Sequence, residues 1–158
     1  MIQRIQTVYL LLAIAACAAL LCFPLVSICD GAGVTVGLLT AFSASFTGGT
    51  LPTVMPVWVL AAFVILGILL RVIAIFSFKN RRNQLRTCRS SLLADGCFVA
   101  LAAVLVWQLL NQLPESHEIS FAPYFVCAFP LLAIVFTLLA MRGIRHDERL
   151  VRAADRLR

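Results

Sequence analysis

Four long apolar runs constrain what this 158-residue chain can fold into more than any other feature. They comprise residues 7–28, 56–76, 91–110 and 123–141. Each can cross ~30 Å of hydrocarbon, which takes about 20 helical residues, and each is apolar on every face. Charged residues make up only 13% of the chain, against about 25% in a soluble domain. The sequence predicts an all-α integral membrane protein, a single domain of residues 1–158 built on a four-helix transmembrane bundle.

The first run has an alternative interpretation as a cleaved signal. Residues 14–17 resemble the box that precedes a lipidated bacterial cysteine. The apolar run nevertheless continues through Val26, whereas the apolar core of a signal is usually about 7–15 residues long. We therefore favour an uncleaved first helix.

Basic residues are segregated between the segments that join these runs. Twelve of the 13 Lys and Arg residues lie in the N-terminal segment, the link 77–90 or the tail 142–158, and the thirteenth is Arg71. The loops at 29–55 and 111–122 contain none. The positive-inside rule assigns the basic side to the cytosol. We therefore expect a multi-pass protein of a bacterial inner membrane with both termini in the cytoplasm.

The arginines of the tail follow helical spacing. They step by three and four residues, as Arg142, Arg145, Arg149, Arg152 and Arg156. This predicts an amphipathic C-terminal helix that either continues past the membrane or lies along it. Its arginine face could rest on anionic headgroups or dock a protein, and nearby acidic residues weaken the pure lipid interpretation. Nucleic acid is not expected, because no aromatic residues are interleaved for stacking on bases.

The link adds further basic residues on the same side of the membrane. They are Lys79, Arg81, Arg82, Arg86 and Arg89. We expect the link and the tail to form one cytosolic surface that contacts anionic lipid of the cytosolic leaflet and a partner protein. This favours a non-enzymatic accessory or scaffold subunit.

Two charged residues, Arg71 and Asp95, lie inside the predicted spans. Both are near the cytosolic ends of consecutive spans, so we expect them to form an intramembrane ion pair or to share water. Alternatively, Arg71 could reach the headgroups with its long stem, and Asp95 could simply favour a helix start. If the pair lined a path, the protein would be a small transporter or channel subunit, and this is the second functional hypothesis. A third, deeper charge would have favoured transport, and the spans contain none.

The remaining reactive residue types predict no enzyme, cofactor or metal site. The six cysteines include no C-x-x-C pair, and zinc sites need close ligand pairs. We interpret Cys17, Cys22 and Cys97 as small packing residues. Cys29 and Cys127 could both lie near the outer interface, where an oxidising periplasm would allow a disulfide. No nucleophile with a base, phosphate loop or H-E-x-x-H motif occurs.

The first outer loop, residues 29–55, is apolar but interrupted by Gly and Pro. Phe42, Ala44 and Phe46 alternate with polar residues, and Thr47 to Thr50 is turn-like. The pattern predicts one or two short strands, arranged as a hairpin on the outer face. A fifth span is disfavoured because the stretch is too short and too rich in glycine.

Three segments together resemble a family of small four-helix membrane proteins from Bacteroidota that is catalogued as a domain of unknown function. They are the opening MIQRIQTVYLLLA, the link sequence NRRNQLR and the ending IRHDERLVRAADRLR. The resemblance covers the whole chain, and the ending is its most specific part. It implies four transmembrane helices in the inner membrane and supplies no catalytic residues.

Overall fold

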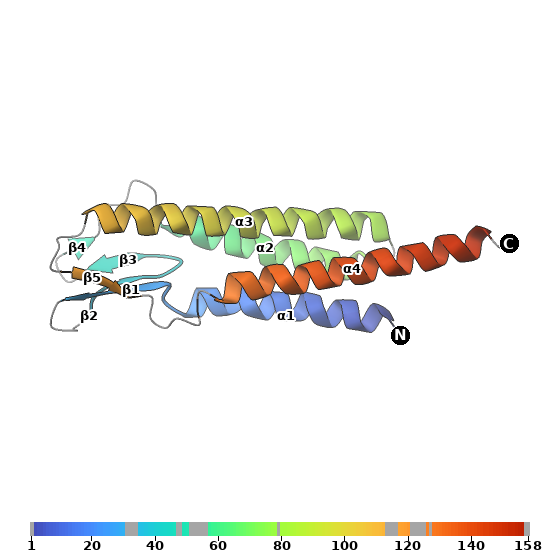
Figure 1. Cartoon of the computed structure of the whole chain (residues 1–158), viewed down its shortest axis with the longest axis horizontal. Helices are drawn as coiled ribbons and strands as arrows, with labels where there is room; N and C mark the ends of the chain where they lie inside the picture. The colour runs from blue at the N-terminus through green and yellow to red at the C-terminus, as the bar shows by residue number, and fades with distance from the viewer. Residues whose placement is uncertain are drawn as a thin grey trace.

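Four α-helices form an elongated antiparallel bundle with a small β-sheet at one end (Figure 1). The computed structural model describes residues 2–30, 35–46, 49–50, 57–78, 80–112, 117–120, 126 and 128–156. Within them the helices are α1 (Ile2–Cys22), α2 (Trp58–Phe76), α3 (Arg81–Gln112) and α4 (Ala128–Arg156). Each of the four is long and apolar enough to cross a membrane.

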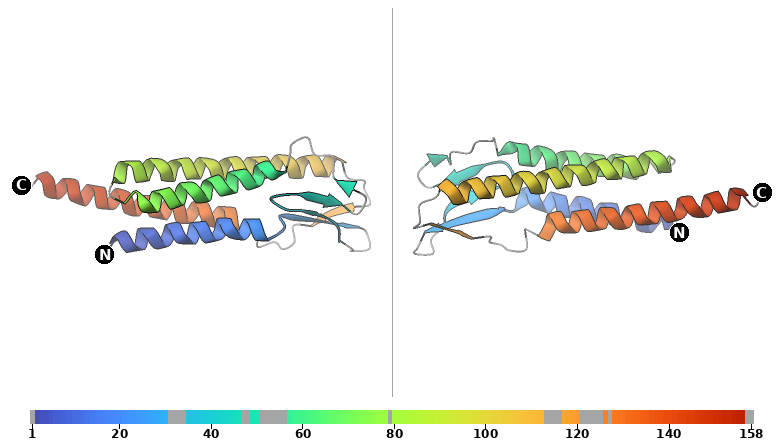
Figure 2. Two further views of the ribbon diagram at one scale, coloured as in Figure 1. Left: turned by 180° about the vertical axis from the view of Figure 1, so that it is seen from behind. Right: turned by 45° about the horizontal axis from the view of Figure 1, so that its top comes forward.

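The helices pack in a square, with α1 against α4 and α2 against α3 as the most extensive contacts. The N-terminus, the turn between α2 and α3, and the C-terminus lie at the end opposite the sheet, and the views in Figure 2 agree on this placement. We call this the terminal end of the bundle. α4 continues beyond the other three helices there and projects along the bundle axis (Figure 1).

The sheet has five strands in the order β4-β3-β2-β1-β5, all antiparallel. They are β1 (Val26–Asp30), β2 (Thr35–Leu39), β3 (Ala44–Phe46), β4 (Gly49–Thr50) and β5 (His117–Ser120). β1 pairs with β2, the next strand in sequence, and with β5 from the segment between α3 and α4. The sheet is therefore larger than the predicted hairpin, because a segment about 90 residues away in sequence adds the edge strand.

The first helix ends earlier than the predicted run 7–28. Helix α1 stops at Cys22, and β1 takes up residues from Val26 onward. Pro24 accounts for this correction, since it has no backbone N–H and disfavours helical geometry at Phe23. Val26 and Ile28, which belong to the same apolar run, are buried as part of strand β1 rather than of the helix.

The predicted link 77–90 is mostly helical rather than a loop. Asn80 caps α3, because its side-chain Oδ1 accepts the backbone N–H of Asn83 at 3.3 Å and its carbonyl accepts that of Gln84 at 3.0 Å. Ser77 closes α2 by donating its backbone N–H to the Ile73 carbonyl at 2.9 Å. The chain thus turns in about four residues, which places the arginines of the link on the first turns of α3.

Candidate functional site: a buried polar layer and an arginine surface

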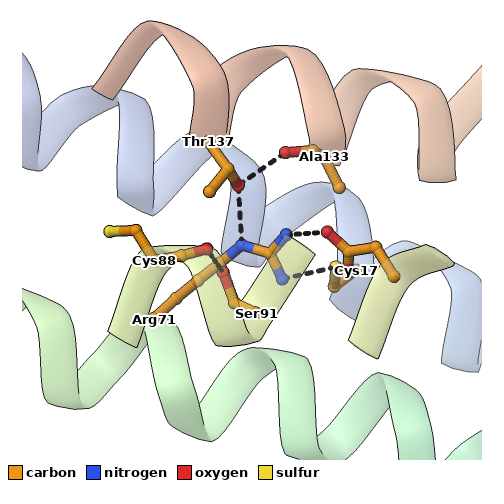
Figure 3. Close-up of polar contacts among 7 residues, drawn as sticks. Cys17, Arg71, Cys88, Ser91, Ala133 and Thr137 are labelled. Carbon is orange, nitrogen blue, oxygen red and sulfur yellow. Dashed lines mark hydrogen bonds and ion pairs between the residues drawn. The ribbon is translucent and has the colours of Figure 1, made fainter. Parts of the chain in front are cut away.

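Arg71 of α2 lies at the centre of the bundle and contacts each of the other three helices. Its side chain is 0% exposed. Its Nε donates to Thr137 Oγ1 of α4 at 3.0 Å, and its Nη1 donates to Cys17 Sγ of α1 at 3.3 Å. Its Nη2 forms an ion pair with Asp95 Oδ2 of α3. One guanidinium therefore joins all four helices (Figure 3).

The partners of Arg71 are held by contacts of their own. The Thr137 hydroxyl donates to the Ala133 carbonyl at 2.7 Å, which leaves its lone pairs to accept from Arg71. A Cβ at Gly67 would lie 3.1 Å from Arg71 Nη1 and 3.3 Å from Asp95 Oδ1. Gly67 thus leaves the space in which the guanidinium meets the carboxylate.

Apolar layers enclose this polar layer on both sides. Toward the terminal end, a cluster of buried side chains fills the bundle: Leu10, Ala74, Leu85, Cys88, Ala140, Met141 and Ile144. Toward the sheet, a second cluster includes Leu20, Val64, Phe98 and Ala133. Within the polar layer Asp95 is 6% exposed and Thr137 is 0% exposed. The charges are therefore paired, hydrogen-bonded and separated from both ends of the bundle, as a buried ion pair requires.

A family model matches residues 2–157, nearly the whole chain. The chain belongs to the family described as Domain of unknown function (DUF4293). No curated protein matches it. The family description assigns no activity, so the function of this DUF4293 protein has to be inferred from its geometry.

The structure divides the predicted arginine surface into an inward and an outward part. Arg81 is half-buried and donates from Nη1 to the backbone carbonyl of Asp147 at 3.0 Å. The outward residues are exposed: Arg82, Arg86 and Arg89 on α3, and Arg142, Arg145 and Arg149 on α4. Lys79 lies outside the described residues, as do the side chains of Arg152 and Arg156, although both arginines belong to α4.

The link and the tail do meet at one place on this surface. A recess of about 290 Å³ between α3 and α4 is lined by Arg82, Arg86, Arg89, Leu85 and Glu148. The three arginines are spaced by four and three residues, so they lie on one face of α3. The DUF4293 protein thus presents a cationic recess next to the base of the projecting helix.

Two members of the polar layer, Cys17 and Thr137, were not predicted from the sequence as partners of Arg71. Cys17 was interpreted as a packing residue, and it is indeed buried, but its sulfur also accepts from Arg71. Thr137 carries the only hydrogen-bonding side chain between residues 128 and 141. A guanidinium has five N–H donors, so a buried Arg71 needs more acceptors than one carboxylate. This count of donors is the feature of the sequence that could have indicated further partners.

The cysteines and other metal-binding residue types form no further site in the described part of the chain. No three His, Cys, Asp or Glu side chains come together there as metal ligands do. Cys29 carries a free thiol in β1, and Cys127 lies outside the described residues. The structure therefore gives no support to a disulfide between them.

Proposed function

We propose that this protein is a non-enzymatic accessory or scaffold subunit of a bacterial inner membrane, with both termini in the cytoplasm. Its arginine-rich terminal end would contact anionic lipid near the membrane and bind a partner protein farther out. The observation that carries this proposal is the unbroken run of α4 from Ala128 to Arg156, past the ends of the other helices (Figure 1).

The length of the projection separates the two contacts. Arg142 and Arg156 are 14 residues apart, or about 21 Å along a straight helix. The attraction of anionic headgroups decays over a Debye length of about 8 Å at physiological ionic strength. The arginines near Arg142 are therefore within reach of the headgroups, whereas Arg152 and Arg156 lie beyond most of that field. A protein is the partner that can meet a helix at this distance.

The composition of the projection supports a protein partner as well. Glu148 and Asp155 lie among the arginines in sequence, and both would be repelled by an anionic lipid surface. A partner surface can match a mixed pattern of charges, and such complementarity gives specificity and fast association. The recess lined by Arg82, Arg86 and Arg89 would hold the lipid contact beside it.

The test is recovery of the partner from native membranes. The intact chain is compared with a variant in which Arg149, Arg152 and Arg156 are replaced by Gln, after crosslinking in cells and extraction in detergent. We expect a membrane or cytosolic protein to co-purify with the intact chain and to be lost from the variant. Arg142 and Arg145 remain in the variant to preserve orientation.

Two controls separate docking from insertion. Replacing the same three arginines by Lys keeps the charge and should retain part of the partner recovery, because Lys lacks the bidentate geometry of Arg. A reporter that fluoresces only in the cytoplasm, fused to the C-terminus, should give equal signals for all three chains. Equal recovery of partner with the Gln variant would contradict a docking role for the projection.

The transport alternative requires a path for water or solute to Arg71 and Asp95. The enclosing apolar layers and the absence of exposure at Arg71 favour a structural role for the pair. Transport would be supported instead if Asp95→Asn abolished a measured flux while the protein stayed folded in the membrane. We expect this substitution to lower the amount of folded protein.

A further inference from the structure

A cavity of about 350 Å³ opens at the terminal end, among all four helices. Its polar lining includes Gln6 of α1, Arg81 and Gln84 of α3, and Asp147 of α4. Its volume is at the lower end of the roughly 300–1,000 Å³ of small-molecule sites. Ile144 and Ile75 also line the cavity. Ile144 belongs to the apolar cluster that separates the cavity from Arg71, and Ile75 packs against that cluster.

Asp147 is the informative residue of this cavity. Its side chain is only 9% exposed, and its Oδ2 accepts from Gln6 Nε2 at 2.8 Å. Arg81 bonds the backbone carbonyl of Asp147 rather than its carboxylate. Among the described residues no cation forms an ion pair with Asp147. Buried carboxylates are normally paired with a positive charge, so this one is suited to a cationic ligand.

Gln84 adds a further polar group to the same cavity. It is 7% exposed and lines the cavity beside Asp147. The Nε2 of Gln6 is committed to Asp147, so its Oε1 is the atom left to accept. The carboxylate and the two amide carbonyls together offer three acceptors. A primary ammonium has three N–H donors, and it matches this set.

Arg81 and two exposed phenylalanines in the cavity lining indicate the chemistry of the rest of the ligand. Arg81 places a guanidinium in the lining, a group with the geometry to bind phosphate, and its Nη2 and Nε are not used by the contact to the Asp147 carbonyl. At the rim, Phe76 is 75% exposed and Phe78 is 52% exposed. Phe76 is the last residue of α2 and Phe78 lies two residues beyond it, where lipid tails would meet headgroups. The cavity thus offers places for an ammonium, a phosphate and the start of an acyl chain.

From this juxtaposition we infer that the cavity binds the phosphoethanolamine headgroup of a membrane phospholipid. The ammonium is held by Asp147, Gln6 and Gln84, and the phosphate is held by Arg81. The inference rests on the membrane placement given under Proposed function but not on the outward arginines. The site is distinct from the α3–α4 recess, whose lining has three arginines and would favour a purely anionic headgroup.

The test is native mass spectrometry of the purified full-length chain in detergent. The chain is mixed with equal amounts of phosphatidylethanolamine, phosphatidylcholine and phosphatidylglycerol of identical acyl chains. Phosphatidylcholine has the same net charge as phosphatidylethanolamine but no N–H donors. We expect a preference of about tenfold for phosphatidylethanolamine over phosphatidylcholine, the factor given by one charge-assisted hydrogen bond at the low end of its range.

Three variants define the site. Asp147→Asn should reduce the preference to about twofold or less, because the charge that selects an ammonium is gone. Gln84→Leu should also reduce it with little change in the melting temperature, because it removes one acceptor for the ammonium and keeps a side chain of similar size. Glu148→Gln changes a neighbouring carboxylate that does not line this cavity and should keep the full preference.

Other outcomes would overturn the inference. Equal binding of the three lipids by the intact chain would show that the cavity does not select the phosphoethanolamine headgroup. A preference that survives both Asp147→Asn and Gln84→Leu would place the lipid elsewhere. Displacement of the lipid by millimolar free phosphoethanolamine would assign the site to a soluble molecule. Loss of the preference in the Gln variant of Arg149, Arg152 and Arg156 would mean that the outward surface, not the cavity, selects the lipid.

Discussion

Two carboxylates, Asp95 and Asp147, are buried almost equally, with 6% and 9% of their side chains exposed. Asp95 lies in the middle of the bundle and forms an ion pair with Arg71. Asp147 lies at the terminal end, accepts from the neutral Gln6 amide and faces a cavity. The Asp95 carboxylate has its counter-ion within the protein, whereas the Asp147 carboxylate borders a cavity that has room for a ligand. Burial alone therefore does not reveal what an acidic residue does, whereas the identity of its partners does.

The largest effect on stability is expected when the ion pair between Arg71 and Asp95 is disrupted. Arg71→Met and Asp95→Leu should each cost about 3–5 kcal/mol of unfolding free energy, because each leaves one buried charge unpaired. The double variant replaces the pair with apolar side chains and should recover most of that loss. Unfolding free energies of the three chains in mixed micelles would measure this. A double variant no more stable than either single one would show that the pair is not the source of the cost.

The four spans and the pairing of Arg71 with Asp95 were predictable because both depend on local sequence patterns. Apolar length identifies the helices, and two lone charges at similar depth on consecutive helices are expected to meet. The sheet was predicted only as a hairpin, since the pairing of β1 with residues 117–120 is a contact distant in sequence. The end of α1 was misplaced because hydropathy does not register the effect of Pro24 on backbone geometry.

The cavity at the terminal end was not predictable for a related reason. Gln6, Gln84 and Asp147 come from three helices, and each looks like an ordinary interfacial polar residue in the sequence. Asp147 was noted only as a charge that weakens a lipid contact. Its inward orientation depends on how far α4 is rotated against α1, which is set by packing at residues such as Leu10 and Ile144.

Substitutions at two glycines compare the closely packed polar layer around Arg71 with an exposed surface of α3. Gly67→Ala adds a Cβ 3.1 Å from Arg71 Nη1 and should displace the ion pair, at a cost of about 1–3 kcal/mol. Gly96→Ala meets nothing within 4 Å and should stabilise α3 by up to about 1 kcal/mol through helix propensity. Thermal unfolding of both variants beside the parent chain is the measurement. Equal effects in the same direction would contradict close packing around the pair.

The hydroxyl of Thr137 tests a smaller part of the same layer. Thr137→Val keeps the shape but removes an acceptor for Arg71 Nε, which should cost about 1.5–3 kcal/mol, as expected for a hydrogen bond to a charged group. Thr137→Ser keeps the hydroxyl and should lose less stability, although it also removes a buried methyl group. The two unfolding free energies should therefore rank Ser above Val. The reverse order would mean that packing of the methyl group outweighs the hydrogen bond.

The smallest effect on stability is expected at Asp147, and it completes the comparison. Asp147→Asn retains an oxygen that can accept from Gln6 and removes a charge without a cationic partner among the described residues. It should change the unfolding free energy by less than about 1 kcal/mol. Asp95→Asn, the matched substitution in the closed layer, should cost several times more, because Arg71 keeps its charge and loses its counter-ion. If Asp147→Asn proved as destabilising as Asp95→Asn, then Asp147 would have a structural role like that of Asp95. Its neutral partner and the open cavity would then not indicate a ligand site.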